Sequence, residues 1–206
     1  MHVKRQTANK EWPIPRKGTK YVVVASHEKI NGIPILIILR EILKIVKDRR
    51  EAKNILNSGE VKVNDRVIKK ENFSVLPFDI VKIRNKKYEL TFSEKGKVEI
   101  KNAEKEERIL KVTGKKILKG KKIQLNLLYG KNIISDGKIN IGDSVVLKDG
   151  KILKIINLEK GKDAMIIAGR YKGKSGKIEK IENKIATLSH KNEKINVPVD
   201  SIMVIK

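Results

Sequence analysis

From residue 97 onward, the chain is a series of short apolar runs separated by glycines. The alternating pattern within these runs is typical of strands, and glycine allows the tight turns between them. The runs lie at residues 109–112, 123–128, 133–134 and 145–147, and Gly114, Gly120, Gly130, Gly137, Gly142 and Gly150 separate or follow them. We therefore expect this half of the chain to fold as a small twisted sheet or barrel.

The first half predicts helices as well as strands, so the expected fold class is α+β. A helix is expected after Pro34, which suits a first turn, because apolar residues follow at helical spacing: Ile35, Leu36, Ile38, Leu39, Ile42, Leu43 and Val46. A second helix is expected from its N-cap Asp48, with Glu51 completing a capping box, to Gly59. Strands are expected at residues 61–67, around an Asn-Asp turn, near Val75, and at residues 80–83 and 88–92.

The charge balance indicates a polyanionic partner. The sequence has 48 Lys and Arg residues against 24 Asp and Glu residues, a formal net charge of +24 and a pI near 10.1. Self-repulsion of this size opposes the compact state unless a polyanion neutralises it, and nucleic acid is the leading candidate. The alternatives are an anionic membrane surface and a lysine-rich host composition, but host bias would raise Glu together with Lys.

The same composition indicates the compartment. The sequence has no cysteine, which excludes disulfides and thiolate chemistry and suits a reducing environment. The longest apolar run, residues 33–39, is far shorter than the roughly twenty residues that cross a bilayer. The chain opens with basic and polar residues and shows no signal-peptide pattern. We expect a cytoplasmic protein with no membrane partner.

The stretch AGRYKGKS at residues 168–175 has the spacing of the phosphate-binding loop of nucleotide hydrolases. That loop requires a helix beginning at its Lys-Ser pair. Here Gly176 and an alternating run at residues 177–181 predict a strand, and too little chain remains for the further strand-helix units of such a domain. The histidines are scattered, and no carboxylate cluster has metal-ligand spacing. We expect no cofactor, no metal, no small-molecule substrate and no enzymatic activity.

Two segments resemble known RNA-binding modules. Residues 35–90, with DRREAKNILNSGEVKVNDRVI at 48–68, are similar to the S4 RNA-binding module. Asp65 stands where that family generally has glycine, so a strained or different turn is expected there. The stretch GKDAMIIAGRYKGKSGKI at residues 161–178 resembles the KOW motif, whose glycines shape the tip of a small SH3-like barrel.

The order of these segments, preceded by a basic arm with HVKR and WPIPRKGTK, resembles the archaeal and eukaryotic small-subunit ribosomal protein family S4e. We accordingly predict a basic N-terminal arm at 1–34, an S4 module at 35–96, a central β domain at 97–160 and a KOW barrel at 161–206. The resemblance implies a structural constituent of the small ribosomal subunit, with small-subunit ribosomal RNA and neighbouring ribosomal proteins as partners. The alternative is a KOW-containing transcription elongation factor or another RNA-binding factor.

RNA contacts are expected on three surfaces. The arm lacks apolar periodicity and is expected to become ordered only on RNA, while like charges at the start of the second helix should attract an anion. In the glycine loop, cations interleave with glycines, and Tyr171 offers a flat face for stacking. The expected contacts are His2, Lys4, Arg5, Lys10, Trp12, Arg16, Lys17 and Lys20 in the arm; Arg40, Arg49, Arg50, Lys53, Lys62 and Arg66 in the S4-like segment; and Gly169, Arg170, Tyr171, Lys172, Gly173, Lys174, Gly176 and Lys177 in the loop.

Overall fold

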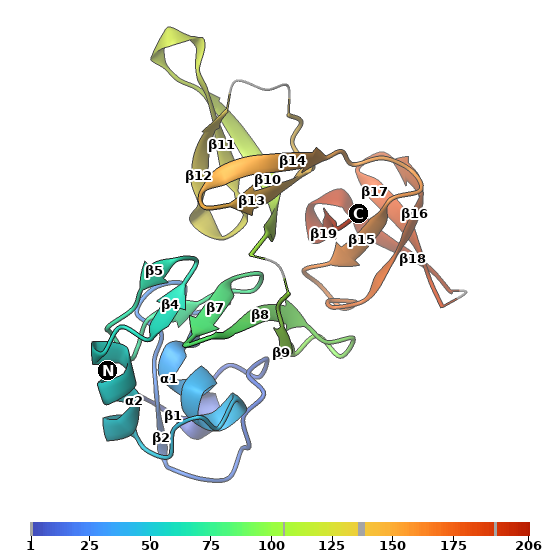
Figure 1. Ribbon diagram of the computed structural model, residues 1–206. Coiled ribbons are helices and arrows are strands. Elements are labelled where there is room, and N and C mark those ends of the chain that lie inside the picture. The colour runs from blue at the N-terminus through green and yellow to red at the C-terminus, as the bar shows by residue number, and fades with distance from the viewer. Residues whose placement is uncertain (1, 105, 136–138, 192) are drawn as a thin grey trace. The chain divides into compact units, whose positions relative to one another are not determined.

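The structure is a computed structural model that describes residues 2–104, 106–135, 139–191 and 193–206 (Figure 1). The chain forms two compact units, of which the first comprises Met1–Thr91 and Lys97–Glu106 and the second comprises Phe92–Gly96 and Glu107–Lys206. Strands dominate both units, and the α-helices of the described residues lie in the first. Among these residues, no helix combines the length and the apolar character that crossing a membrane requires.

The first unit contains a five-stranded sheet in the order β5-β4-β7-β8-β9 and two smaller strand pairs, β1-β2 and β3-β6. The strands expected near Val75 and at residues 80–83 and 88–92 are confirmed. The strands are β1 (His2–Lys4), β2 (Tyr21–Val23), β3 (Ile33–Pro34), β4 (Val61–Val63), β5 (Arg66–Val67), β6 (Ser74–Val75), β7 (Ile80–Ile83), β8 (Lys86–Phe92) and β9 (Val98–Asn102).

The second expected helix is confirmed as α2 (Arg49–Asn57). Asp48 caps it, because its carboxylate accepts a hydrogen bond from the Glu51 N–H at 2.8 Å. The Glu51 side chain reaches one residue beyond the cap and accepts from the Lys47 N–H at 2.8 Å. Gly59 follows with φ +76°, the left-handed conformation that commonly ends a helix.

The first expected helix is wrong in its length. Instead of running to Val46, the chain forms α1 (Ile35–Ile37), continues as a π-helix over Ile38–Ile42, and stops. Leu43 donates its N–H to the carbonyl of Ile38 at 2.9 Å, which is the wider π turn, and Lys44 then takes φ +52°. Residues 35–39 are all buried, so the segment is covered on every side rather than along one stripe. Helical spacing alone therefore overestimated its length.

The turn between β4 and β5 belongs to a regular hairpin type despite the aspartate. Asn64 and Asp65 have φ +49° and +67°, the combination found in type I′ turns. The Asn64 side chain fixes this geometry, because its amide donates to Asp79 Oδ1 at 3.0 Å and its carbonyl accepts from the Ile80 N–H at 3.1 Å. Asp65 itself pairs with Lys82 at 2.5 Å. Asp65 is thus held by Lys82, and its neighbour Asn64 is held by Asp79 and Ile80.

The N-terminal arm is ordered, contrary to the expectation from its composition. β1 pairs antiparallel with β2, with His2 opposite Val23. Trp12 is only 6% exposed, and the Val98 N–H donates to the carbonyl of Glu11 at 3.0 Å, which joins the arm to β9. The arm has too few apolar residues for a core of its own, but it completes the core of the first unit.

The second unit consists of two five-stranded sheets, ordered β12-β11-β10-β13-β14 and β18-β17-β16-β15-β19. The strands expected from the glycine-separated runs and on either side of the glycine loop are confirmed. The strands are β10 (Arg108–Ile117), β11 (Ile123–Leu127), β12 (Asn132–Ser135), β13 (Ser144–Lys148), β14 (Lys151–Ile156), β15 (Asp163–Ile166), β16 (Ser175–Glu182), β17 (Ile185–His190), β18 (Glu193–Pro198) and β19 (Ile202–Val204). One apolar cluster includes side chains of both sheets, among them Val146 and Ile178.

Candidate RNA interface

The start of α2 carries exposed cations, one of which already has an acidic partner. Arg49 donates from Nε to Glu71 Oε2 at 2.7 Å and from Nη2 to Glu71 Oε1. These hydrogen bonds lower the pKa of the Glu71 carboxyl and raise that of Arg49. Arg50 and Lys53 are exposed, and neither forms an ion pair with a described residue. The anion expected at this helix start is therefore supplied in part by the chain itself.

Residues of both the arm and α2 influence the Glu71 carboxyl. Arg49 and burial have the larger effects on the pKa of the Glu71 carboxyl. The charges of Lys53 and His2 have smaller effects, and both lower this pKa further. His2 lies in β1 at the start of the arm, whereas Lys53 lies in the second turn of α2. Two basic residues that are far apart in the sequence, one in β1 and one in α2, thus act on the same carboxylate.

Two predicted contacts of the arm are internal. The Arg5 side chain is 8% exposed and donates to Thr19 O at 2.8 Å, Pro15 O at 2.9 Å and Thr19 Oγ1 at 2.8 Å. Its guanidinium also lies 3.7 Å from Glu41 Oε1, so Arg5 holds the arm together and joins it to the π-helix. Trp12 is also buried, so its ring lies away from solvent. The remaining predicted residues of the arm are exposed: His2, Lys4, Lys10, Arg16, Lys17 and Lys20.

The hairpin of the first unit offers two more free cations. Lys62 on β4 and Arg66 on β5 are exposed, and neither pairs with a carboxylate of the described chain. Arg40 differs, because it is partly buried and its Nη2 lies 2.9 Å from Glu41 Oε1. Lys62 and Arg66 therefore fit an RNA-facing role more directly than Arg40 does.

The glycine loop between β15 and β16 is closed by its own backbone. Lys172 donates its N–H to Gly169 O at 3.2 Å, Gly173 to Ile166 O at 2.7 Å and Lys174 to Tyr171 O at 3.1 Å. These N–H groups are the ones that would have to cradle a phosphate in a nucleotide-binding loop. Ser175 moreover begins β16, where such a loop would require the first turn of a helix. The loop lacks the geometry for nucleotide binding that its sequence spacing suggests.

The glycines of this loop are required for different structural reasons. Gly169 and Gly173 adopt φ +87° and +88°, which favours glycine at both positions. A Cβ at Gly173 would lie 1.9 Å from the Ser93 carbonyl oxygen, and a Cβ at Gly176 would lie 2.1 Å from that of Ser189. A Cβ at Gly169 would meet nothing within 4 Å. Close backbone packing therefore accounts for two of the three glycines, without reference to a ligand.

The cations of the loop gather around aromatic rings. Arg170 Cζ lies 5.8 Å and Lys174 Nζ 5.4 Å from the centroid of the Tyr171 ring, and Lys172 Nζ lies 4.3 Å from that of Phe92. Tyr171 is also partly buried against the apolar cluster of the second unit. Its ring is already in contact with cations, so base stacking on Tyr171 remains a prediction.

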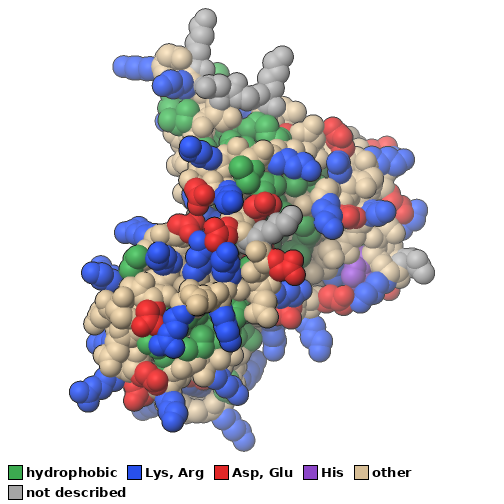
Figure 2. All heavy atoms as spheres, viewed as in Figure 1, with side chains coloured by type: hydrophobic (Ala, Val, Ile, Leu, Met, Phe, Trp, Pro, Cys, Tyr) green, Lys and Arg blue, Asp and Glu red, His purple; other side chains and the backbone are tan. Residues whose placement is uncertain are grey.

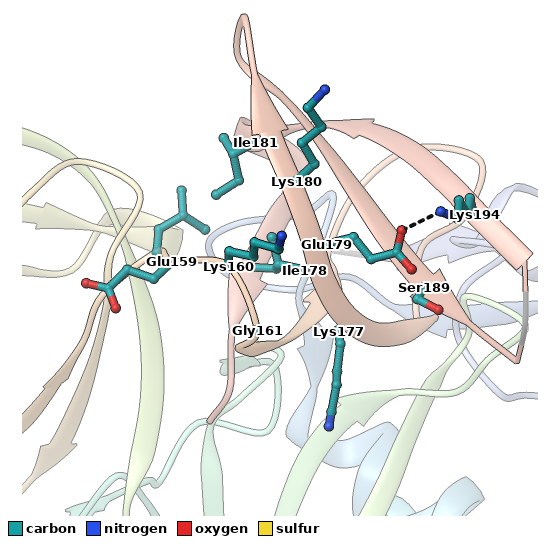
Figure 3. A pocket seen from close by; sticks show the side chains of 11 residues that line it. Glu159, Lys160, Gly161, Lys177, Ile178, Glu179, Lys180, Ile181, Ser189 and Lys194 are labelled. Carbon is teal, nitrogen blue, oxygen red and sulfur yellow. Dashed lines mark ion pairs between the residues drawn. The ribbon is translucent and has the colours of Figure 1, made fainter.

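A hollow with a volume of about 1060 Å³ lies beside β16. Lys160, Lys177, Lys180 and Lys194 line it together with apolar side chains such as Ile181. In Figure 3, Lys177 and Lys180 point in opposite directions from the strand, and Lys194 pairs with Glu179 at 2.9 Å. The lysines therefore do not converge on one point, as they would around a small anion. The hollow therefore suits contact with a run of successive phosphates better than binding of one small anion in a closed pocket.

On the face seen in Figure 2, cations are spread widely rather than gathered in one patch. Figure 2 shows Lys and Arg side chains across the viewed face, with Asp and Glu between them.

Sequence reasoning missed one further basic element, the turn region between β10 and β11, although five lysines occur within KKILKGKK at residues 115–122. The missed signal was a local run of one charge without any acid.

Comparisons with known proteins agree on one family. The family model "Ribosomal family S4e" matches residues 84–152, the S4 domain matches residues 34–81 and the KOW motif matches residues 160–189. The small ribosomal subunit protein eS4 of Methanospirillum hungatei is 37% identical over 86% of this chain and 78% of its own length. That of Methanocaldococcus jannaschii is 33% identical over 99% of this chain and 93% of its own.

A solved structure shows the same fold. The crystal structure of the 30S ribosomal protein S4e from Thermoplasma acidophilum matches with a TM-score of 0.73 and 30% sequence identity. The match covers 86% of this chain and 96% of the other. The expected fold class, an S4-like α+β module followed by β domains that end in a KOW barrel, is confirmed.

Proposed function

The chain belongs to the S4e family of small ribosomal subunit proteins, and from this membership we propose that it is a structural constituent of the small subunit that binds and stabilises ribosomal RNA. Translation is the process that such a constituent serves. The partners are small-subunit ribosomal RNA and adjacent ribosomal proteins, which would place the protein on cytoplasmic ribosomes.

The observation that carries this proposal is that exposed cations without an ion pair to a described residue lie on helices and strands of both units. Arg50 and Lys53 lie on α2, Lys62 and Arg66 on the hairpin of the first unit, and Lys177 on β16. Structured RNA is recognised mainly through phosphates, 2′-hydroxyl groups and shape, so several separate basic faces on one chain can hold several RNA segments. No step of chemistry is needed, and the family is one of structural proteins.

Within this proposed function, the buried residues support the fold and the exposed basic residues are the candidates for RNA contact. Arg5 and Trp12 are buried and hold the arm, and Gly173 and Gly176 allow close backbone packing. The proposed phosphate contacts are the exposed basic residues: His2, Lys4, Lys10, Arg16, Lys17, Lys20, Arg50, Lys53, Lys62, Arg66, Arg170 and Lys177. Lysine and arginine at such sites neutralise phosphates with little dependence on base sequence.

Sedimentation of a tagged copy in cell lysate tests the proposal. The full chain should move with small ribosomal subunits and remain there when salt is raised enough to remove loosely bound proteins. A transcription factor of the KOW type would move with RNA polymerase instead. Recovery with polymerase, or loss from the subunits at moderate salt, would overturn the ribosomal assignment.

A further inference from the structure

The turn between β10 and β11 lies beyond the last paired positions of its sheet. The two strands pair as far as Ile117 opposite Ile123, and β12 pairs with β11 only up to that same position, with Ser135 opposite Ile123. The turn beyond is closed by a hydrogen bond from the Leu118 N–H to Lys122 O at 2.8 Å. Figure 1 shows this ribbon (yellow-green) projecting from the sheet. We call residues 115–122 the β10–β11 finger.

The finger carries a run of lysines without an acidic residue in its own sequence. Its sequence, KKILKGKK, contains five lysines and no Asp or Glu. Lys115, Lys116, Lys119 and Lys122 are exposed, and none forms an ion pair with a carboxylate of the described chain. Holding like charges at the tip of a narrow ribbon is unfavourable unless an external anion binds there.

An apolar side chain lies among these lysines. Ile117 is 78% exposed, although it lies on the same side of the ribbon as Leu125, which is completely buried. The core of the sheet ends between these two positions, so Ile117 adds nothing to it. Its exposed side chain is therefore available for an apolar contact beside the lysines of the turn.

We propose that the β10–β11 finger is an RNA-binding element that lays its tip into a groove or loop of ribosomal RNA; this rests on the proposed function. The lysines contact phosphates on both sides of the tip, and Ile117 packs on ribose or an unstacked base. The wide, shallow minor groove of A-form RNA accommodates a two-stranded ribbon, whereas its deep major groove does not. Gly120, with φ +79° and open space around it, keeps the tip narrow.

Two sets of lysine variants with the same charge change test the finger. The first replaces Lys115, Lys116 and Lys119 with Gln; the control replaces Lys148, Lys151 and Lys154, which are also exposed and unpaired and lie on the β13–β14 hairpin of the same sheet. Binding of the full-length proteins to transcribed small-subunit ribosomal RNA is measured over a range of salt concentrations. The finger variant should lose about tenfold or more in affinity, and its salt slope should fall by about 2 relative to wild type. The control should change by less than about threefold.

Ile117→Asn separates the apolar contact from charge. Because Ile117 is exposed, thermal unfolding should be unchanged. The affinity for RNA should fall several-fold while the salt slope stays at the wild-type value, since no phosphate contact is lost.

The outcomes distinguish the finger from the protein as a whole. Equal losses of RNA affinity in the finger and control variants would overturn the proposal that the finger is an RNA-binding element, while leaving the ribosomal assignment intact. Unchanged RNA affinity together with failure of the finger variant to enter small subunits in cells would assign the finger to an acidic protein neighbour and overturn RNA as its partner. A wild-type protein that binds ribosomal RNA no better than unrelated RNA of equal length would instead contradict the proposed function.

Discussion

Gly173 packs directly on the backbone of Ser93, so closely that a Cβ at position 173 would lie 1.9 Å from the Ser93 carbonyl oxygen. Ser93 lies in the short segment Phe92–Gly96 that belongs to the second unit. Lys172, next to this glycine, lies over the ring of Phe92. This contact explains the presence of glycine at position 173 by packing rather than by a bound phosphate.

Gly173→Ala should therefore destabilise the second unit much more than Gly169→Ala. Both positions have nearly the same positive φ, so each alanine costs about 1–2 kcal/mol of backbone strain. At position 173, displacement of the Ser93 backbone adds about 1–3 kcal/mol, whereas position 169 is open. Denaturant unfolding of both variants measures the difference. Equal free energies of unfolding would show that the contact with Ser93 does not form.

Trp12→Ala should lower the stability of the first unit by about 3 kcal/mol, the lower end of the range for a buried tryptophan. The exposed Lys10→Ala in the same arm is the control and should change stability by less than about 0.5 kcal/mol. The comparison is made by thermal unfolding without RNA. If both variants unfolded like wild type, the arm would be disordered in free solution, as its composition alone suggests.

Charge reversal at Arg49 and at Arg50 should have different effects. Arg50→Glu should weaken RNA binding without changing thermal stability, because Arg50 is exposed and has no ion-pair partner among the described residues. Arg49→Glu should also lower stability, since it removes the Arg49–Glu71 pair and places a second carboxylate beside Glu71. Affinity and melting temperature are measured on the same preparations. A stability loss of the same size in both variants would be inconsistent with the Arg49–Glu71 pair.

The stability of the second unit should rise between about pH 8 and pH 10.5 through Lys111. This lysine donates from Nζ to Val199 O at 2.6 Å, and burial lowers its pKa from 10.5 to about 8. In that range the folded state has released the Lys111 proton while the unfolded state still binds it, so raising the pH favours folding. Below pH 8 both states are protonated and the gain is absent.

Lys111→Met removes the titrating group and should flatten this rise. Denaturant unfolding of wild type and variant across pH 7–10.5 isolates the contribution of Lys111 from that of the other lysines and tyrosines, which titrate in both proteins. Identical pH slopes would mean that Lys111 is solvated in the folded state.

Short-range patterns in the sequence correctly predicted those elements whose formation depends on residues close together in the chain. The Asp48–Glu51 cap, the helix stop at Gly59 and the strands around the glycine loop all follow from short-range patterns, and all occur in the structure. Spacing was insufficient for residues 35–46, because the helix ends in the π-helical stretch Ile38–Ile42 and Lys44 then takes a positive φ, which the spacing of apolar residues does not predict.

Contacts between distant parts of the chain could not be predicted. The pairing of Arg49 with Glu71, the burial of Arg5 and Trp12, and the approach of Gly173 to Ser93 each join residues that no local pattern links. These contacts determine which cations remain available to bind RNA. A basic residue in the sequence therefore marks a candidate contact, and the fold assigns it to the surface or to the interior.

The most direct test of the central claim is crosslinking of the protein to RNA in whole-cell lysate, followed by sequencing of the attached RNA and identification of the crosslinked peptides. We predict crosslinks concentrated in small-subunit ribosomal RNA, with peptides from the exposed residues of the arm, from α2 and from the β10–β11 finger. Crosslinks distributed over messenger or transfer RNA, without enrichment of small-subunit ribosomal RNA, would contradict the assignment.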